Sequence, residues 1–208
     1  MSEDGISYEM TAERENIINA VSGAFAEISN NSVANLHPSG HETNNITIGQ
    51  ATFESNGNKY TLIYKMIALS HGKYPMITVE LFNAPSQEAV TTNDKLASRS
   101  FSINEKGGTE VEITSKINTK GRVASHGFGA ALGLISNDVI NDIISKRLVD
   151  QLGGKKVIGV IIDNAAPDSN DLQNRARNGW SSWLAKKLGY ELSNKPGGFQ
   201  PRWTKSYQ

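Results

Sequence analysis

The sequence predicts an α/β (α+β) chain in one domain, residues 1–208, built on a mixed β-sheet flanked by helices. Three observations support this fold class. The chain has 208 residues and no internal repeat, a length typical of one large domain or two small ones. Its middle alternates apolar and polar residues, as antiparallel strands do. Residues 156–162 form an almost continuous apolar run, which is typical of a strand buried on both faces.

The first elements are a short strand at 6–10 and a helix that begins after Thr11. Thr11 is a suitable N-cap, and Glu13 and Glu15 lie in the first turn, where the helix dipole favours anions. The apolar residues then recur at steps of three and four, which predicts a helix ending near residues 29–31. They are Ile17, Ile18, Val21, Phe25 and Ile28.

The middle of the chain is predicted to be a series of antiparallel strands. Asn56-Gly57 is a strong hairpin signal, because both central residues of a type I′ turn need a positive φ, and Lys106-Gly107-Gly108 is a second one. The predicted strands are at 46–53, 59–69, 76–82, 99–103 and 109–117.

The last third changes to alternating helices and strands. A glycine-rich segment, 121–129, precedes a predicted helix at 130–152, which Ser136-Asn137-Asp138 could interrupt. The buried strand at 156–162 and a helix at 178–188 follow. Residues 191–207 are predicted to form a terminal hairpin or an extended tail.

Composition excludes several classes of protein. There is no cysteine, which excludes disulfides and thiolate metal sites, and no apolar stretch reaches the length that a membrane helix needs. His37 and His41 are the only histidines at i, i+4 spacing, but Pro38-Ser39-Gly40 between them predicts a loop, so no metal site is expected. The N-terminus is acidic and lacks a signal-peptide pattern, which predicts a cytoplasmic protein without membrane contact.

Two motifs, in the expected order, resemble the GNAT superfamily of acyl-CoA-dependent N-acyltransferases. Residues 124–129, Ala-Ser-His-Gly-Phe-Gly, match the two glycines of the family's Gln/Arg-x-x-Gly-x-Gly/Ala loop but not its first residue. Further on, the family's Asn-x-x-Ala-x-x-Leu-Tyr-x-Lys-x-Gly-Phe pattern is partly reproduced. The matching residues are Asn178, Leu184, Lys187 and Gly189, and Tyr190 replaces the final Phe. The resemblance covers residues 109–190, and a helix and a buried strand separate the motifs, as in the family.

The resemblance implies a GNAT-like fold, acetyl-CoA or another acyl-CoA as cofactor, and an amine-bearing acceptor. The glycine loop would hold the pyrophosphate, Ile117 and Thr119 would line the pantetheine arm, and Asn178 would bind near the thiol end. The loop residues implied are Ser125, His126, Gly127, Phe128, Gly129 and Ala130. Residues 76–103 would be a β insert in this fold. A glycine packed in a tight strand-to-helix turn is the alternative interpretation of the loop. If the loop holds phosphate, Gly129→Asp is expected to abolish CoA binding with little loss of stability.

Acyl transfer from a thioester to an amine needs a base for the ammonium and an acid for the leaving thiolate. The family's usual acid, a Tyr, is replaced by Ala185, so Tyr190 is the candidate acid, with Tyr207 a further possibility. Glu112 on the strand 109–117 is the candidate base. The alternatives are aromatic residues that anchor the last strands and a carboxylate on a solvated strand face.

The sequence leaves two further functions open. The C-terminal segment interleaves aromatic and basic residues, a pattern that can stack bases and neutralise phosphates, so a GNAT-fold enzyme that modifies nucleic acid is one alternative. The residues of this pattern are Trp180, Trp183, Lys186, Lys187, Lys195, Phe199, Arg202, Trp203, Lys205 and Tyr207. A non-catalytic binding protein with a decayed acyl-CoA site, marked by Ala124 and Ala185, is the other.

Overall fold

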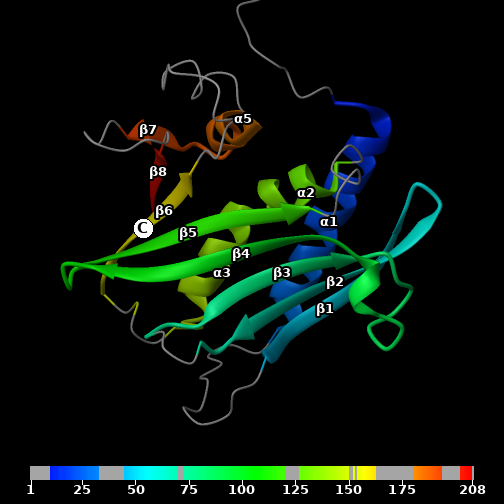
Figure 1. The fold of residues 1–208 in the computed structure, drawn as a ribbon, viewed down its shortest axis with the longest axis horizontal. Helices are drawn as coiled ribbons and strands as arrows, with labels where there is room; N and C mark the ends of the chain where they lie inside the picture. The colour runs from blue at the N-terminus through cyan, green and yellow to red at the C-terminus, as the bar shows by residue number, and fades with distance from the viewer. Residues whose placement is uncertain are drawn as a thin grey trace, which may run out of the picture.

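The computed structural model describes residues 10–32, 45–69, 73–119, 127–149, 152, 154–162, 180–193 and 202–207. The strands of these residues form one eight-stranded sheet, in the order β1-β2-β3-β4-β5-β6-β8-β7 (Figure 1). The strands are β1 (Asn45–Ser55), β2 (Asn58–Ile67), β3 (Met76–Phe82), β4 (Lys95–Lys106), β5 (Glu110–Thr119), β6 (Lys156–Ile162), β7 (Glu191–Ser193) and β8 (Arg202–Tyr207).

The sheet is mixed, as the sequence predicts. β1 to β5 form an antiparallel meander, β6 joins β5 in parallel, and β8 pairs antiparallel with both β6 and β7. The parallel pair follows from the helices between β5 and β6, because a parallel connection must cross back over the sheet. The predicted fold class, a mixed sheet flanked by helices, is confirmed. The strand expected at 6–10 lies outside the described residues.

The helices form a layer in which α2 contacts α1, α3 and α5. They are α1 (Ala12–Asn31), α2 (Phe128–Leu134), α3 (Ser136–Ser145) and α5 (Trp180–Lys187), and a short 3-10 helix, Thr92–Asp94, precedes β4. Thr11 caps α1 as expected, since its hydroxyl accepts from the Arg14 amide at 3.3 Å. The helical segment expected at 130–152 is divided into two helices at Ile135, next to the interruption that Ser136-Asn137-Asp138 suggests, and the second helix ends at Ser145 rather than Leu152.

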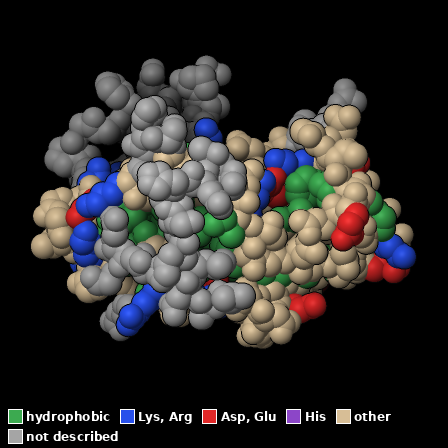
Figure 2. All heavy atoms as spheres, turned by 90° about the horizontal axis from the view of Figure 1, so that it is seen from below, with side chains coloured by type: hydrophobic (Ala, Val, Ile, Leu, Met, Phe, Trp, Pro, Cys, Tyr) green, Lys and Arg blue, Asp and Glu red, His purple; other side chains and the backbone are tan. Residues whose placement is uncertain are grey.

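The two faces of the sheet have different surroundings. On the helix face, alternate residues of β5, Val111 and Ile113, belong to the main core with α1, α2 and α3. The second face is more polar and carries two buried glutamates, Glu80 and Glu112, together with a small apolar cluster around Phe82. On the face shown in Figure 2, acidic and basic side chains of the described residues are interspersed rather than gathered by sign.

The segment expected as a β insert, Met76 to Ile103, supplies β3 and most of β4. β4 is longer than predicted, because it begins at Lys95 rather than Arg99. Both strands are hydrogen-bonded to a neighbour on each edge, so removing them would separate β2 from β5. The single-domain boundary at 1–208 stays a prediction. Within the described part of the chain, no helix is long and apolar enough to cross a membrane.

Candidate functional site

The candidate site lies where β5 and β6 stop pairing. Their parallel ladder runs from Glu110↔Lys156 to Ser115↔Ile161, whereas β5 continues to Thr119. Figure 1 shows β6 leaving β5 at an angle at this end. Among the described residues, no strand pairs with the β6-side edge of β5 beyond Ser115. Peptide N–H and C=O groups along this edge are therefore left for another partner.

The N-terminus of α2 lies against the same end of β5. Gly127 is its N-cap with φ 85°, a left-handed conformation that glycine adopts at little cost. A Cβ at Gly129 would lie 3.1 Å from Thr119 Cγ2 and 3.6 Å from Ile117 Cδ1. The structure thus brings three predicted cofactor residues together. It also gives Gly129 a packing role, because the space that a side chain would need is filled by β5.

The other predicted loop residues divide into two groups. Phe128 and Ala130 are buried, and the Phe128 ring lies 5.7 Å from the Tyr60 ring, so both side chains belong to the core rather than to an open cradle. Ser125, His126 and Asn178 lie outside the described residues, and their predicted roles stay predictions.

The two predicted catalytic residues lie on opposite faces of the sheet. Glu112 alternates with Val111 and Ile113, which face the helices, so its side chain is on the second face. There its carboxylate forms an ion pair with Arg202. Tyr190 belongs to the main core on the helix side. Glu112 and Tyr190 therefore do not form an acid–base pair around one substrate, because the sheet separates them.

Tyr190 is part of a buried hydrogen-bond chain. Its hydroxyl lies 2.8 Å from the Tyr207 hydroxyl, which donates to Asn137 Oδ1 at 2.6 Å. Since the Tyr207 proton is used in this way, Tyr190 donates to Tyr207. Burial raises the pKa of both hydroxyls. A Cβ on Gly159 would come within 2.4 Å of the Tyr190 hydroxyl, so glycine is needed for this chain to lie on β6.

Arg99 on β4 is a buried cation near the hydrogen-bonded tyrosines Tyr190 and Tyr207. It is 2% exposed, its Nη2 donates to Ser115 Oγ at 2.7 Å, and its Nε has no hydrogen-bond partner. Burial lowers the pKa of Arg99 to about 10, against the opposing effect of Tyr190 and Tyr207. None of the ion pairs formed by the described residues includes Arg99.

The sequence analysis did not identify Arg99 or Ser115, although a signal was present. Arg99 is in phase with Ala97, Phe101 and Ile103, which all point to the core. A charged residue in an inward position of an alternating strand is unusual, because burying a charge is costly. Ser115 in the same way follows Val111 and Ile113 on the helix face of β5.

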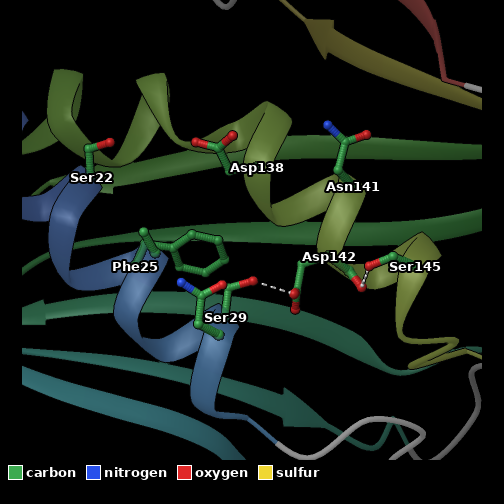
Figure 3. A pocket seen from close by; sticks show the side chains of 9 residues that line it. Ser22, Phe25, Ser29, Asp138, Asn141, Asp142 and Ser145 are labelled. Atoms are coloured by element: carbon green, nitrogen blue, oxygen red, sulfur yellow. Dashed lines mark hydrogen bonds between the residues drawn. The ribbon is translucent and has the colours of Figure 1, made fainter.

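A cavity of about 380 Å³ lies elsewhere, between α1 and α3 (Figure 3). Asp142, 4% exposed, is its buried charge: its Oδ1 accepts from Ser29 Oγ at 2.6 Å and from Lys146 Nζ at 2.7 Å. Lys146 also donates to the Ser29 carbonyl and to Ser32 Oγ, so the ion pair joins α3 to the end of α1. The described residues contain no cluster of three or more metal-ligating side chains here or elsewhere.

The C-terminal strand uses several of its basic and aromatic residues internally. Arg202 pairs with Glu112, and Lys205 donates to the Leu188 carbonyl at 2.8 Å and lies over the Tyr207 ring. Trp203 is buried. These residues are therefore engaged within the fold, while nucleic-acid contact through the rest of the segment stays a prediction.

Comparisons with known proteins give limited similarity. No family model matches the chain, and no curated protein matches it. An acetyltransferase of the GNAT family from Streptococcus pneumoniae aligns with 64% of this chain and 67% of its own, at 12% identity and a TM-score of 0.36. A domain from Methanocaldococcus jannaschii aligns over the same shares, at 14% identity and a TM-score of 0.35. At these scores the alignments carry no argument about activity.

The described elements follow one another as α1, the antiparallel meander β1 to β5, the helices α2 and α3, the parallel strand β6, the helix α5 and the antiparallel last strands β7 and β8. This order is observed in the structure itself and does not depend on the alignments.

Proposed function

We propose that this chain is an N-acyltransferase that uses acetyl-CoA or a related acyl-CoA. The observation that supports the proposal is the end of the β5·β6 pair. There, a strand edge that no described strand pairs with meets the glycine turn that begins α2. The sequence resemblance implies the same pair of features for an acyl-CoA site.

The described residues fit part of this cofactor. The pantetheine arm is an extended chain with two amides, and the edge of β5 beyond Ser115 offers it unpaired peptide groups. Ile117 and Thr119 lie beside Gly129 on the helix face of this segment, and this position supports assigning them to the lining of the arm. Gly129 does not add space for a phosphate, because β5 already fills that space. Among the described residues, Gly127 at the start of α2 is therefore left for any pyrophosphate contact.

When bound, an acyl-CoA supplies a thioester carbonyl that an amine can attack. We assign binding and orientation to the β5 edge, because holding two reactants in a suitable geometry is a large part of the barrier reduction in such transfers. Glu112 and Tyr190 are not assigned a shared step. The Tyr190 proton is donated to Tyr207, and Glu112 is ion-paired across the sheet.

Titration of the purified chain with acetyl-CoA and with CoA tests the proposal. Thr119→Trp is expected to weaken acetyl-CoA binding at least tenfold, because the larger side chain occupies the space beside α2. Asn118→Trp is the matched control: Asn118 is the adjacent exposed residue, on the other face of β5, and binding should be unchanged. Absence of acetyl-CoA and CoA binding at millimolar concentrations would contradict the proposed function.

A further inference from the structure

Two hydrogen-bond donors at the end of the β5·β6 pair have no acceptor among the residues that the structure describes. Arg99 Nε–H is buried and unpartnered. Ser115 Oγ accepts from Arg99 Nη2, so its own hydrogen remains to be donated, and none of the described residues accepts it. Ser115 is the last β5 residue that pairs with β6, and Arg99 pairs with Ile117 across the β4·β5 ladder. Both donors thus lie at the proposed acyl-CoA site.

The charge at this position is also unbalanced. A buried cation is normally offset by a carboxylate, and Arg99 has none among the residues that the structure describes. The titratable groups that affect it are the Tyr190 and Tyr207 hydroxyls, which burial keeps neutral. Neutral hydroxyls cannot offset a full positive charge. The local surroundings therefore favour an anion that accepts two hydrogen bonds.

We infer that Arg99 and Ser115 bind a carboxylate carried by the acceptor substrate, so that the preferred acceptors are amino acids or other amines with a nearby carboxylate. A guanidinium is planar and matches the two oxygens of a carboxylate better than it matches a single point charge. The edge of the Arg99 guanidinium that includes Nε–H would bind the carboxylate, because Nε has no partner among the described residues. The carboxylate site is derived from the structure alone, whereas its assignment to an acceptor rests on the proposed function.

The first arm of the test measures carboxylate binding without any reaction. The melting temperature, Tm, of the wild-type chain is compared in sodium acetate and in sodium chloride at equal ionic strength and pH, with neutral acetamide as the uncharged probe. Acetate is expected to raise the Tm by several degrees at saturation, since a ligand that binds only the folded state stabilises it. Acetamide should not. Arg99→Met should abolish the acetate shift, and Ser115→Ala should reduce it.

Lys116→Met is the matched control, because it removes one positive charge from the neighbouring exposed residue on the other face of β5. This variant should keep the full acetate shift. Arg99→Lys retains a charge without the planar fork and should show a reduced shift, which keeps the test valid if Arg99→Met does not fold. Equal Tm values of the wild type in acetate and chloride would overturn the inference, as would an undiminished shift in both Arg99 variants.

The second arm measures acceptor choice. With acetyl-CoA as donor, kcat/KM for glycine is compared with kcat/KM for glycinamide, which lacks the carboxylate. The wild type should prefer glycine at least tenfold, and Arg99→Met should lose this preference. An acetate shift without acetyl-CoA binding would overturn the proposed function but keep the carboxylate site. Acetyl-CoA binding without an acetate shift would overturn the carboxylate site alone.

Discussion

Asp142 and Arg99 are both buried charges, but their surroundings differ. Asp142 accepts from Lys146 and Ser29, and these contacts join α3 to α1. Among the described residues, Arg99 donates to a serine hydroxyl and its Nε has no hydrogen-bond partner. Removing either member of a buried ion pair destabilises the native state, because the other charge is left without a partner. A buried charge without an ion partner lowers the stability of the native state. We therefore infer that Arg99 serves ligand binding rather than stability.

The largest loss of stability is expected when Asp142 is removed. Asp142→Ala should lower the free energy of unfolding by about 3 kcal/mol, because the partly buried ammonium of Lys146 then lacks its counter-charge. Urea denaturation measures this. Asn141→Ala, an exposed neighbour that lines the same cavity, is the control and should change stability by less than about 0.5 kcal/mol. Equal losses in the two variants would show that the ion pair does not hold the helices together.

Gly129→Asp now has a different expected outcome from the one that the sequence predicts. A side chain there meets Thr119 and Ile117, and a carboxylate would be placed in a buried position. The free energy of unfolding should fall by about 2–3 kcal/mol. Gly23→Asp serves as control, because a Cβ at Gly23 meets no atom within 4 Å. A Gly129→Asp protein as stable as the wild type would contradict the packing role.

Tyr207→Phe tests the hydrogen-bond chain beside Arg99. The change removes the donor to Asn137 and the acceptor for Tyr190, so it should cost about 1–2 kcal/mol of stability. A double-mutant cycle with Tyr190→Phe isolates the bond between the two hydroxyls and should give a coupling of about 1 kcal/mol. Strictly additive effects would mean that the two tyrosines do not act as a unit.

The smallest effect on stability is expected for Glu80, on the second face of the sheet, and it is seen at acidic pH. Burial raises the pKa of Glu80, but hydrogen bonds from Lys65 and Lys95 outweigh this, and the net pKa is lowered. The folded pKa is thus below the unfolded one. The stabilisation is fully present above the unfolded pKa of about 4.3 and is lost as the pH falls through the folded pKa. Unfolding measured between pH 5 and pH 3 should show a shallower loss for Glu80→Gln than for the wild type.

Glu105 is expected to contribute to the remaining slope in that experiment. Lysines 155 and 73 hold the pKa of Glu105 at about 2, and this group is present in both proteins. An identical pH profile for Glu80→Gln and the wild type would contradict the role of the two Glu80 lysines.

Local patterns were sufficient to predict most elements but not the contacts between them. The α1 helix follows from the spacing of its apolar residues, and the β1–β2 hairpin from Asn56-Gly57. The break at Ile135 also follows from a local pattern, since Ser136-Asn137-Asp138 directly after it are residue types that favour a helix start over a helix interior. Glu112 was predicted as a base from its strand position alone. Its ion partner, Arg202, is 90 positions away, and no local pattern shows which strand will lie beside it.

The same limit applies to the candidate site. Ile117, Thr119 and Gly129 meet as the motif implies, because a strand and the next helix are neighbours in sequence. Arg99 lies at the site because the pairing of β4 with β5 sets it opposite Ile117. Tyr190 is far from both strands in the sequence. Spacing alone does not encode such long-range placement.

The free energy of unfolding of Arg99→Met, measured by urea denaturation in buffer without carboxylates or acyl-CoA, tests most directly whether Arg99 serves a ligand rather than the fold. Replacing a buried, unpaired cation with an apolar side chain of similar length should leave stability unchanged or raise it. Lys116→Met on the same sheet provides the baseline for losing one positive charge. We predict that Arg99→Met is at least as stable as the wild type. A loss of about 3 kcal/mol or more, comparable to that of Asp142→Ala, would show that Arg99 is part of the structural core and would contradict the account.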